Sequence, residues 1–158
     1  MACYHLTCKI IGRSAGRSAV AAAAYRSRDK LYDQRQGMEF DYSRKHDLIH
    51  AEILLPESAP ERLKDRETLW NEVETVEKRK DAQLAREIEL ALPKELNLNQ
   101  QIELVREYAQ VQFVDKGMIA DICMHESETN PHVHIMLTLR EITSVHPETG
   151  KFEEKAAG

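Results

Sequence analysis

The chain has 158 residues, 42% of them hydrophobic and 31% charged, which predicts a single globular domain with room for a core. It has no apolar run near the roughly 18 residues of a membrane-spanning helix and no signal peptide at its start, so no membrane insertion and a cytoplasmic location are expected. The net charge of −5 disfavours a general nucleic-acid-coating protein, yet residues 9–45 hold nine basic and four acidic side chains. That basic segment is typical of a local phosphate-binding surface, and the alternative is an accidental run of solvated charges.

Local patterns in the first third of the chain predict a strand followed by a helix. The strand is expected over residues 3–11, which are rich in strand formers, and a basic Ser/Gly-rich turn follows it. Residues 17–28 contain a run of alanines, which have the highest helix propensity, and predict a helix. Residues 31–45 are polar with scattered aromatic side chains and are expected to form a loop or a poorly ordered hairpin.

The middle of the chain predicts a second strand and a second helix. The strand covers residues 50–55 and stops at Pro56. Ser58 and Glu61 have the spacing of a capping box, which predicts a helix that begins there and runs to about Lys80.

The second half of the chain predicts three strands and one more helix. Alternation of apolar and polar residues predicts a strand over 86–92, and a helical apolar stripe predicts a helix over 99–115. Strands over 118–125 and 132–140 are expected to pair across a polar loop. This order predicts an α+β fold with a mainly antiparallel central sheet packed by helices. Residues 143–158 are expected to be a polar turn and tail at a truncation end.

The densest chemical signal is a group of three histidines, His125, His132 and His134, within ten residues. Alternate side chains of a strand share a face, so His132 and His134 are expected to point the same way, and the polar loop would let His125 fold back beside them. Three imidazoles with open coordination positions suit a catalytic divalent ion such as Mn²⁺, Mg²⁺ or Zn²⁺, a choice that ligand type does not decide. The alternative is a set of structural histidines. We expect a metal-assisted enzyme.

Two further groups of residues would complete such a site. Glu87 and Glu89 share a strand face, so either could orient an imidazole or take a proton; the alternative is a solvated strand face. Tyr25 lies at the end of the alanine-rich segment, flanked by Arg26 and Arg28, and cations or a metal would help it to act as a nucleophile. Its alternative role is to anchor that helix to the core.

Several sequence blocks in register resemble the MobA/MobL family of conjugative relaxases, and together they cover almost all of residues 3 to 140. The matching blocks are residues 4–6, 16–25, 65–71, 86–93 and 130–134. The last block contains the His-hydrophobe-His motif of that family. The resemblance implies the relaxase fold of the His-hydrophobe-His endonuclease superfamily, with a catalytic domain over residues 1–142.

The resemblance also implies roles for individual residues. Tyr25 matches the catalytic tyrosine, and Glu87 matches a carboxylate beside the metal site, with Glu89 as a second candidate. Three histidines match the ligands of a divalent ion, Mn²⁺ or Mg²⁺ (with Zn²⁺ or Ni²⁺ as substitutes in a crystal): His125, His132 and His134. The basic segment adds the hypothesis that four arginines contact DNA phosphates: Arg13, Arg17, Arg26 and Arg28.

The function implied by the resemblance is the site- and strand-specific nicking of single-stranded DNA at a plasmid transfer origin. Tyr25 would form a 5′-phosphotyrosyl intermediate and the strand would later be rejoined. The implied partners are the single strand and its adjacent hairpin, with auxiliary mobilisation proteins and a type IV coupling protein as further candidates.

Three other functions remain open from the sequence. A rolling-circle replication initiator or transposase of the same superfamily tends to place the histidines before the tyrosine, whereas here Tyr25 precedes them by about a hundred residues. A three-histidine metal hydrolase or oxygenase would act on a small molecule without needing Tyr25. A non-catalytic module would bind single-stranded DNA regardless of metal.

Overall fold

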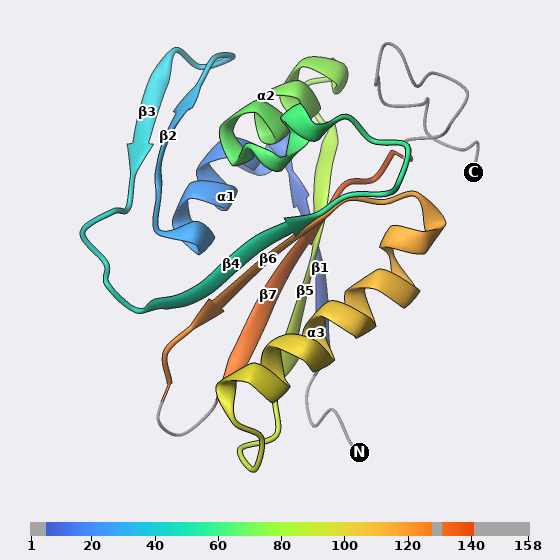
Figure 1. Cartoon of the computed structure of the whole chain (residues 1–158). Coiled ribbons are helices and arrows are strands. Elements are labelled where there is room, and N and C mark those ends of the chain that lie inside the picture. Colours follow the sequence, from blue (N-terminus) through green and yellow to red (C-terminus); the bar gives the residue numbers. More distant parts are fainter. Residues whose placement is uncertain (1–5, 128–130, 141–158) are drawn as a thin grey trace.

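The computed structural model describes residues 6–127 and 131–140, in which a five-stranded antiparallel sheet with strand order β1-β5-β7-β6-β4 is packed by helices (Figure 1). The predicted α+β fold is therefore confirmed, while the expected tail over 143–158 lies outside the described residues. The main elements are β1 (Leu6–Gly12), α1 (Ala19–Ser27), β2 (Lys30–Asp33), β3 (Met38–Asp41), β4 (Leu48–Leu54), α2 (Arg66–Val76), β5 (Gln83–Ala91), α3 (Leu98–Gln112), β6 (Ala120–His125) and β7 (His132–Leu137). Short 3-10 turns cover Arg13–Ala15, Glu61–Lys64 and Val114–Lys116. Within the described residues, no helix has both the length and the apolar character needed to cross a bilayer.

Two hydrophobic cores lie on opposite faces of the sheet because side chains alternate along each strand. Val105 and Ala109 of α3 belong to one core, together with Ile135 of β7. Met136, the next residue of β7, points to the other face and joins the core beneath α1 and α2. The α1–α2 layer also includes Trp70, which is fully buried. The sheet therefore has one face closed by α3 and a second face that α1 and α2 cover toward one end.

A buried ion cluster ties α2 to the sheet. Asp121 of β6 is 2% exposed and accepts hydrogen bonds from two nitrogens of the Arg66 guanidinium and from Nε1 of Trp70, at 2.8 to 3.0 Å. Arg66 also reaches Asp29, just after α1, at 3.3 Å. The nearby carboxylates raise the pKa of the Arg66 guanidinium above its ordinary value although burial opposes this.

Residues 31–45 form a more regular structure than the sequence predicts. Strands β2 and β3 pair in register from Lys30↔Asp41 to Asp33↔Met38. Side chains of α2 hold this hairpin, since Asn71 donates to the Tyr32 carbonyl and accepts from the Gln34 amide. The local sequence does not reveal such anchors, which is why the expected loop or poorly ordered hairpin is corrected to an ordered one.

The predicted capping box at Ser58 is wrong, and the helix begins later. Residues Glu61–Lys64 form a separate 3-10 turn. Asp65 then caps α2, its carboxylate accepting from the Thr68 amide, while its own ψ of 117° interrupts the helical backbone.

Candidate active site

The β6–β7 hairpin brings the three histidines together on the face that α3 does not cover. His125 pairs directly opposite His132, and His134 follows two residues along the same face. The ring centroids of His125 and His134 are 5.3 Å apart, and those of His132 and His134 are 6.1 Å apart. The grouping expected from the sequence is therefore present.

Strand β5 adds two carboxylates to the same face. Glu89 pairs opposite His134, and Glu87 lies two residues away. The Glu87 side chain is 1% exposed, with Oε2 3.4 Å from Nδ1 of His134. Glu89 is 34% exposed and lies 3.8 Å from both His132 Nε2 and His134 Nδ1. Both glutamates thus face the histidines, Glu87 from inside the protein and Glu89 from its surface.

Glu87 is ionised in this setting. Burial would raise its pKa, but the adjacent His134 imidazole and Arg26 guanidinium outweigh burial and lower the pKa to about 2. Arg26 Nε donates to Oε2 of Glu87, and the Lys9 ammonium lies 3.8 Å from Oε1. One buried negative charge is therefore approached by two cations and one imidazole, with Arg26 and His134 at the same oxygen.

The last turn of α1 lies against the histidine cluster. The Arg26 carbonyl accepts a 2.6 Å hydrogen bond from Nε2 of His125, while the Arg26 side chain binds Glu87. Three alanines of this helix are fully buried: Ala19, Ala23 and Ala24. Their small side chains let the helix lie close to the sheet. Tyr25, one residue before Arg26, is 42% exposed.

Cations surround the Tyr25 ring. The Arg28 guanidinium carbon lies 4.8 Å and the Lys45 ammonium 4.9 Å from the ring centroid, and Tyr42 packs edge-on at 5.2 Å. Asp47 holds Arg28 through two hydrogen bonds of 2.8 and 3.1 Å. Sequence reasoning missed Lys45, Tyr42 and Asp47, because nothing in their local pattern places them beside Tyr25.

The imidazole nitrogens and carboxylate oxygens on this face are ligand atoms that fit a divalent cation. Nδ1 of His134 is buried, lies 3.4 Å from Oε2 of Glu87 and makes no hydrogen bond among the described residues. Among the described residues, the ligand atoms of His134, Glu87 and Glu89 lie within 4.8 Å of one another, and this group does not include His125 or His132. Nε2 of His125 donates a hydrogen bond to the Arg26 carbonyl, so in this conformation Nδ1 is the ring nitrogen that can still coordinate a metal. Burial lowers the pKa of His125 despite that hydrogen bond, which favours the neutral, ligating imidazole.

Comparison with known proteins identifies the family. The family model described as MobA/MobL matches residues 17–157 of this chain. The chain belongs to the MobA/MobL family. Related members include the conjugal transfer protein TraA of Rhizobium radiobacter, 44% identical over 153 residues, and the mobilization protein MobL of Acidithiobacillus ferridurans, 40% identical over 151 residues.

A solved structure shares the fold of this MobA/MobL chain. It comes from work titled "Molecular Basis of Vancomycin Resistance Transfer in Staphylococcus aureus", and it superposes with a TM-score of 0.90 at 40% sequence identity. The match covers 99% of the present chain and 78% of that structure. The alignments to TraA and MobL cover 90% and 96% of the present chain but only 14% and 39% of those proteins.

The structure of this MobA/MobL chain separates the four arginines predicted to contact DNA. Arg17 lies exposed beside α1, while Arg26 and Arg28 are engaged by Glu87 and Asp47 close to Tyr25. The Arg13 guanidinium instead donates to the Glu74 carboxylate and to carbonyls at the end of α2. Only 10% of its side chain is exposed, so we assign Arg13 an anchoring role in place of the predicted phosphate contact.

Proposed function

We propose that this domain is a relaxase: it nicks single-stranded DNA at a transfer origin by transesterification, with Tyr25 as the nucleophile. The observation that carries the proposal is the contact between the Arg26 carbonyl and His125, which joins the Tyr25 turn to the histidine cluster. The names of the relatives support it, because they describe conjugal transfer, mobilization and, in a Salmonella typhimurium protein 27% identical to this chain, relaxation.

The proposed reaction conserves the free energy of the phosphodiester bond. The Tyr25 hydroxyl loses its proton and attacks phosphorus in line, forming a phosphotyrosyl bond to the 5′ side of the break. The bond from phosphorus to the 3′ oxygen breaks, and that oxygen leaves as a hydroxyl after taking up a proton. Because one phosphodiester replaces another, the reverse reaction can rejoin the strand without a nucleoside triphosphate.

The residues around Tyr25 have distinct proposed tasks. Arg28 and Lys45, next to the ring, would stabilise negative charge on the phenolic oxygen and on the phosphate. Glu87 would orient His134 and keep Arg26 in place. A divalent ion held by His125, His132 and His134, with Mn²⁺ or Mg²⁺ as the first candidates, would supply Lewis-acid polarisation of the phosphate oxygens.

Covalent capture tests this function. The protein is mixed with Mn²⁺ and labelled single-stranded oligonucleotides tiled across the non-coding DNA beside its gene, then separated on a denaturing gel. We expect a slow band that resists SDS and disappears with EDTA or in Tyr25→Phe. Tyr32→Phe is the matched control, because Tyr32 is a similarly exposed tyrosine on β2, and it should keep the band.

The outcomes separate the rival functions. No adduct on any tile, with Mn²⁺ binding demonstrated by calorimetry, would overturn the nicking function and favour a binding module or a small-molecule metalloenzyme. An adduct that survives EDTA would overturn the metal dependence. An adduct retained by Tyr25→Phe would remove Tyr25 as the nucleophile.

A further inference from the structure

A pocket of about 400 Å³ opens beside Tyr25, between β1, α1 and the β2–β3 hairpin. Its size is within the range of pockets that hold small ligands, about 300 to 1,000 Å³. Ile11 of β1 and two α1 residues, Ala21 and Ala22, give it an apolar floor. Tyr25 and Arg26 line the same pocket, so it is continuous with the proposed active site.

The charged side chains that line the pocket are all basic among the described residues: Lys9, Arg17 and Arg26. This is notable in a chain with a net charge of −5. Lys9 and Arg26 both pair with one carboxylate, that of Glu87, so its single negative charge balances only one of the two cations. Arg17, which lines the same pocket, is exposed. The pocket therefore keeps a positive excess and is complementary to an anion.

The hairpin supplies the opposite wall. Met38 is 48% exposed, which is high for a large apolar residue, and it lines the pocket with Phe40 and Tyr42. Gln36, at the turn of the hairpin, adds an amide that can both donate and accept hydrogen bonds. A flat apolar group bearing polar edges and an attached anion matches this combination.

We propose that the pocket binds one unstacked nucleotide of the single strand, next to the phosphate that Tyr25 attacks. The base lies between the apolar floor and the Met38–Phe40 wall, its phosphate faces the three cations, and Gln36 contacts the base edge. Stacking and charge of this kind are how proteins hold single strands. The β2–β3 hairpin thus becomes a specificity element. This inference rests on the proposed function, since it takes Tyr25 as the nucleophile.

The hairpin wall of the pocket is preorganised by contacts within the protein. The Tyr32 amide donates to Glu67 at 2.7 Å, and the Gln34 amide donates to Asn71 at 2.9 Å. The Arg35 guanidinium donates to the buried Glu74 carboxylate at 2.8 Å. Three contacts with α2 thus fix the hairpin, so a base entering the pocket need not order its wall.

A coupling experiment tests the pocket without requiring turnover. Tyr25→Phe keeps the ring and serves as the background. Its affinity is measured by fluorescence anisotropy for the oligonucleotide tile that binds most tightly, and for copies with one abasic position each. We expect one position at which loss of the base weakens binding by about tenfold. Met38→Ala should weaken binding of the intact oligonucleotide about fivefold. In that variant, loss of the base at this position should cause almost no further loss of affinity.

Tyr32→Ala is the matched control, because Tyr32 is 45% exposed on the same hairpin and points to its opposite face. It should leave the affinity and the abasic penalty unchanged. Gln36→Ala should reduce the preference among the four bases at the coupled position by about fivefold or more.

Additive effects of Met38→Ala and the abasic substitution at every position would overturn the pocket, as would equal losses in Tyr32→Ala. If Met38 and the base are coupled but the wild-type protein forms no covalent adduct, the nucleotide pocket is retained and the nicking function is overturned. If the wild-type protein forms an adduct but no coupling is found, the nicking function is retained and the nucleotide pocket is overturned.

Discussion

At the residue scale, Asp47 positions the side chain that lies on Tyr25. Arg28 has a left-handed backbone (φ 56°), which costs a non-glycine residue of order 1 kcal/mol, and its contacts with Asp47 and the Tyr25 carbonyl hold it there. We expect Asp47→Asn to slow adduct formation about tenfold with little change in single-strand affinity. Asp41→Asn is the control, since the Asp41 carboxylate accepts hydrogen bonds only from Ser43 among the residues described. Equal rates in the two variants would contradict this role.

The ion pair of Asp47 and Arg28 should stay fully ionised across the working pH range. The Arg28 hydrogen bond lowers the pKa of Asp47 to about 2 from an ordinary 3.8. A carboxyl with a lowered pKa contributes stability that is complete above its ordinary pKa and is lost as the pH falls through about 2. The ratio of wild-type to Asp47→Asn rate constants should therefore stay constant between about pH 5 and pH 9. A ratio that rises or falls through this range would show that another titrating group controls the contact.

A second residue-scale prediction concerns the buried cluster of Asp121, Arg66 and Trp70. Asp121→Asn keeps the shape but leaves the Arg66 guanidinium paired, within the described part of the chain, only with Asp29, which is half-exposed. Because breaking a buried ion pair leaves an uncompensated charge, the free energy of unfolding should fall by about 3 kcal/mol in urea titration. Asp115→Asn, at an exposed position, should change it by less than about 0.5 kcal/mol. A loss below about 1 kcal/mol for Asp121→Asn would show that Asp29 suffices.

At the element scale, one carboxylate joins α1, α2 and the hairpin. Glu74 of α2 is 3% exposed; it accepts from the Ala19 amide at the start of α1 and from the guanidiniums of Arg13 and Arg35. A negative charge there also complements the positive end of the helix dipole.

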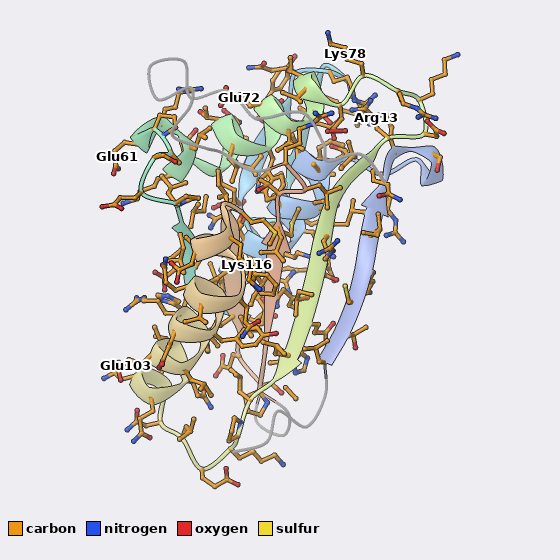
Figure 2. All side chains as sticks on the ribbon, turned by 90° about the vertical axis from the view of Figure 1, so that its right-hand side faces the viewer. Arg13, Glu61, Glu72, Lys78, Glu103 and Lys116 are labelled. Atoms are coloured by element: carbon orange, nitrogen blue, oxygen red, sulfur yellow. The ribbon has the colours of Figure 1, made fainter. Side chains whose placement is uncertain are left out.

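Loss of this carboxylate should be costly. Glu74→Ala should lower the free energy of unfolding by about 3 kcal/mol in urea titration and weaken single-strand binding through the loosened hairpin. Glu72→Ala is the control: Figure 2 labels Glu72 on the same helix, and its partner Arg62, on the preceding 3-10 turn, is 42% exposed. That surface pair should contribute less than about 1 kcal/mol. Similar losses in both variants would exclude a special role for Glu74.

The elements also explain what the sequence could predict. Strict alternation over 86–92 and 132–134 predicts which side chains share a face within each strand. The meeting of Glu87 and Glu89 with the histidines also requires β5 to pair with β7, which alternation does not specify; the family resemblance alone implied that Glu87 lies beside the histidines. The order of the hairpin was not predictable, since it depends on Asn71 and Glu74. The predicted phosphate contact of Arg13 failed for the same reason: its partners are more than 60 residues away in the chain.

At the scale of the whole molecule, a pocket whose charged lining is basic lies in a chain with a net charge of −5, and DNA binding should depend on salt accordingly. Single strands release about 0.7 counterion per phosphate contact, so contacts by Lys9, Arg17 and Arg26 should contribute about −2 to the slope of log affinity against log salt. Lys9→Gln should reduce the magnitude of that slope by about 0.7. Lys116, labelled in Figure 2, is the matched control, because it is exposed just after α3 and does not line the pocket. Lys116→Gln should leave the slope unchanged, whereas equal effects of the two substitutions would mean that DNA responds to the net charge and not to the basic pocket.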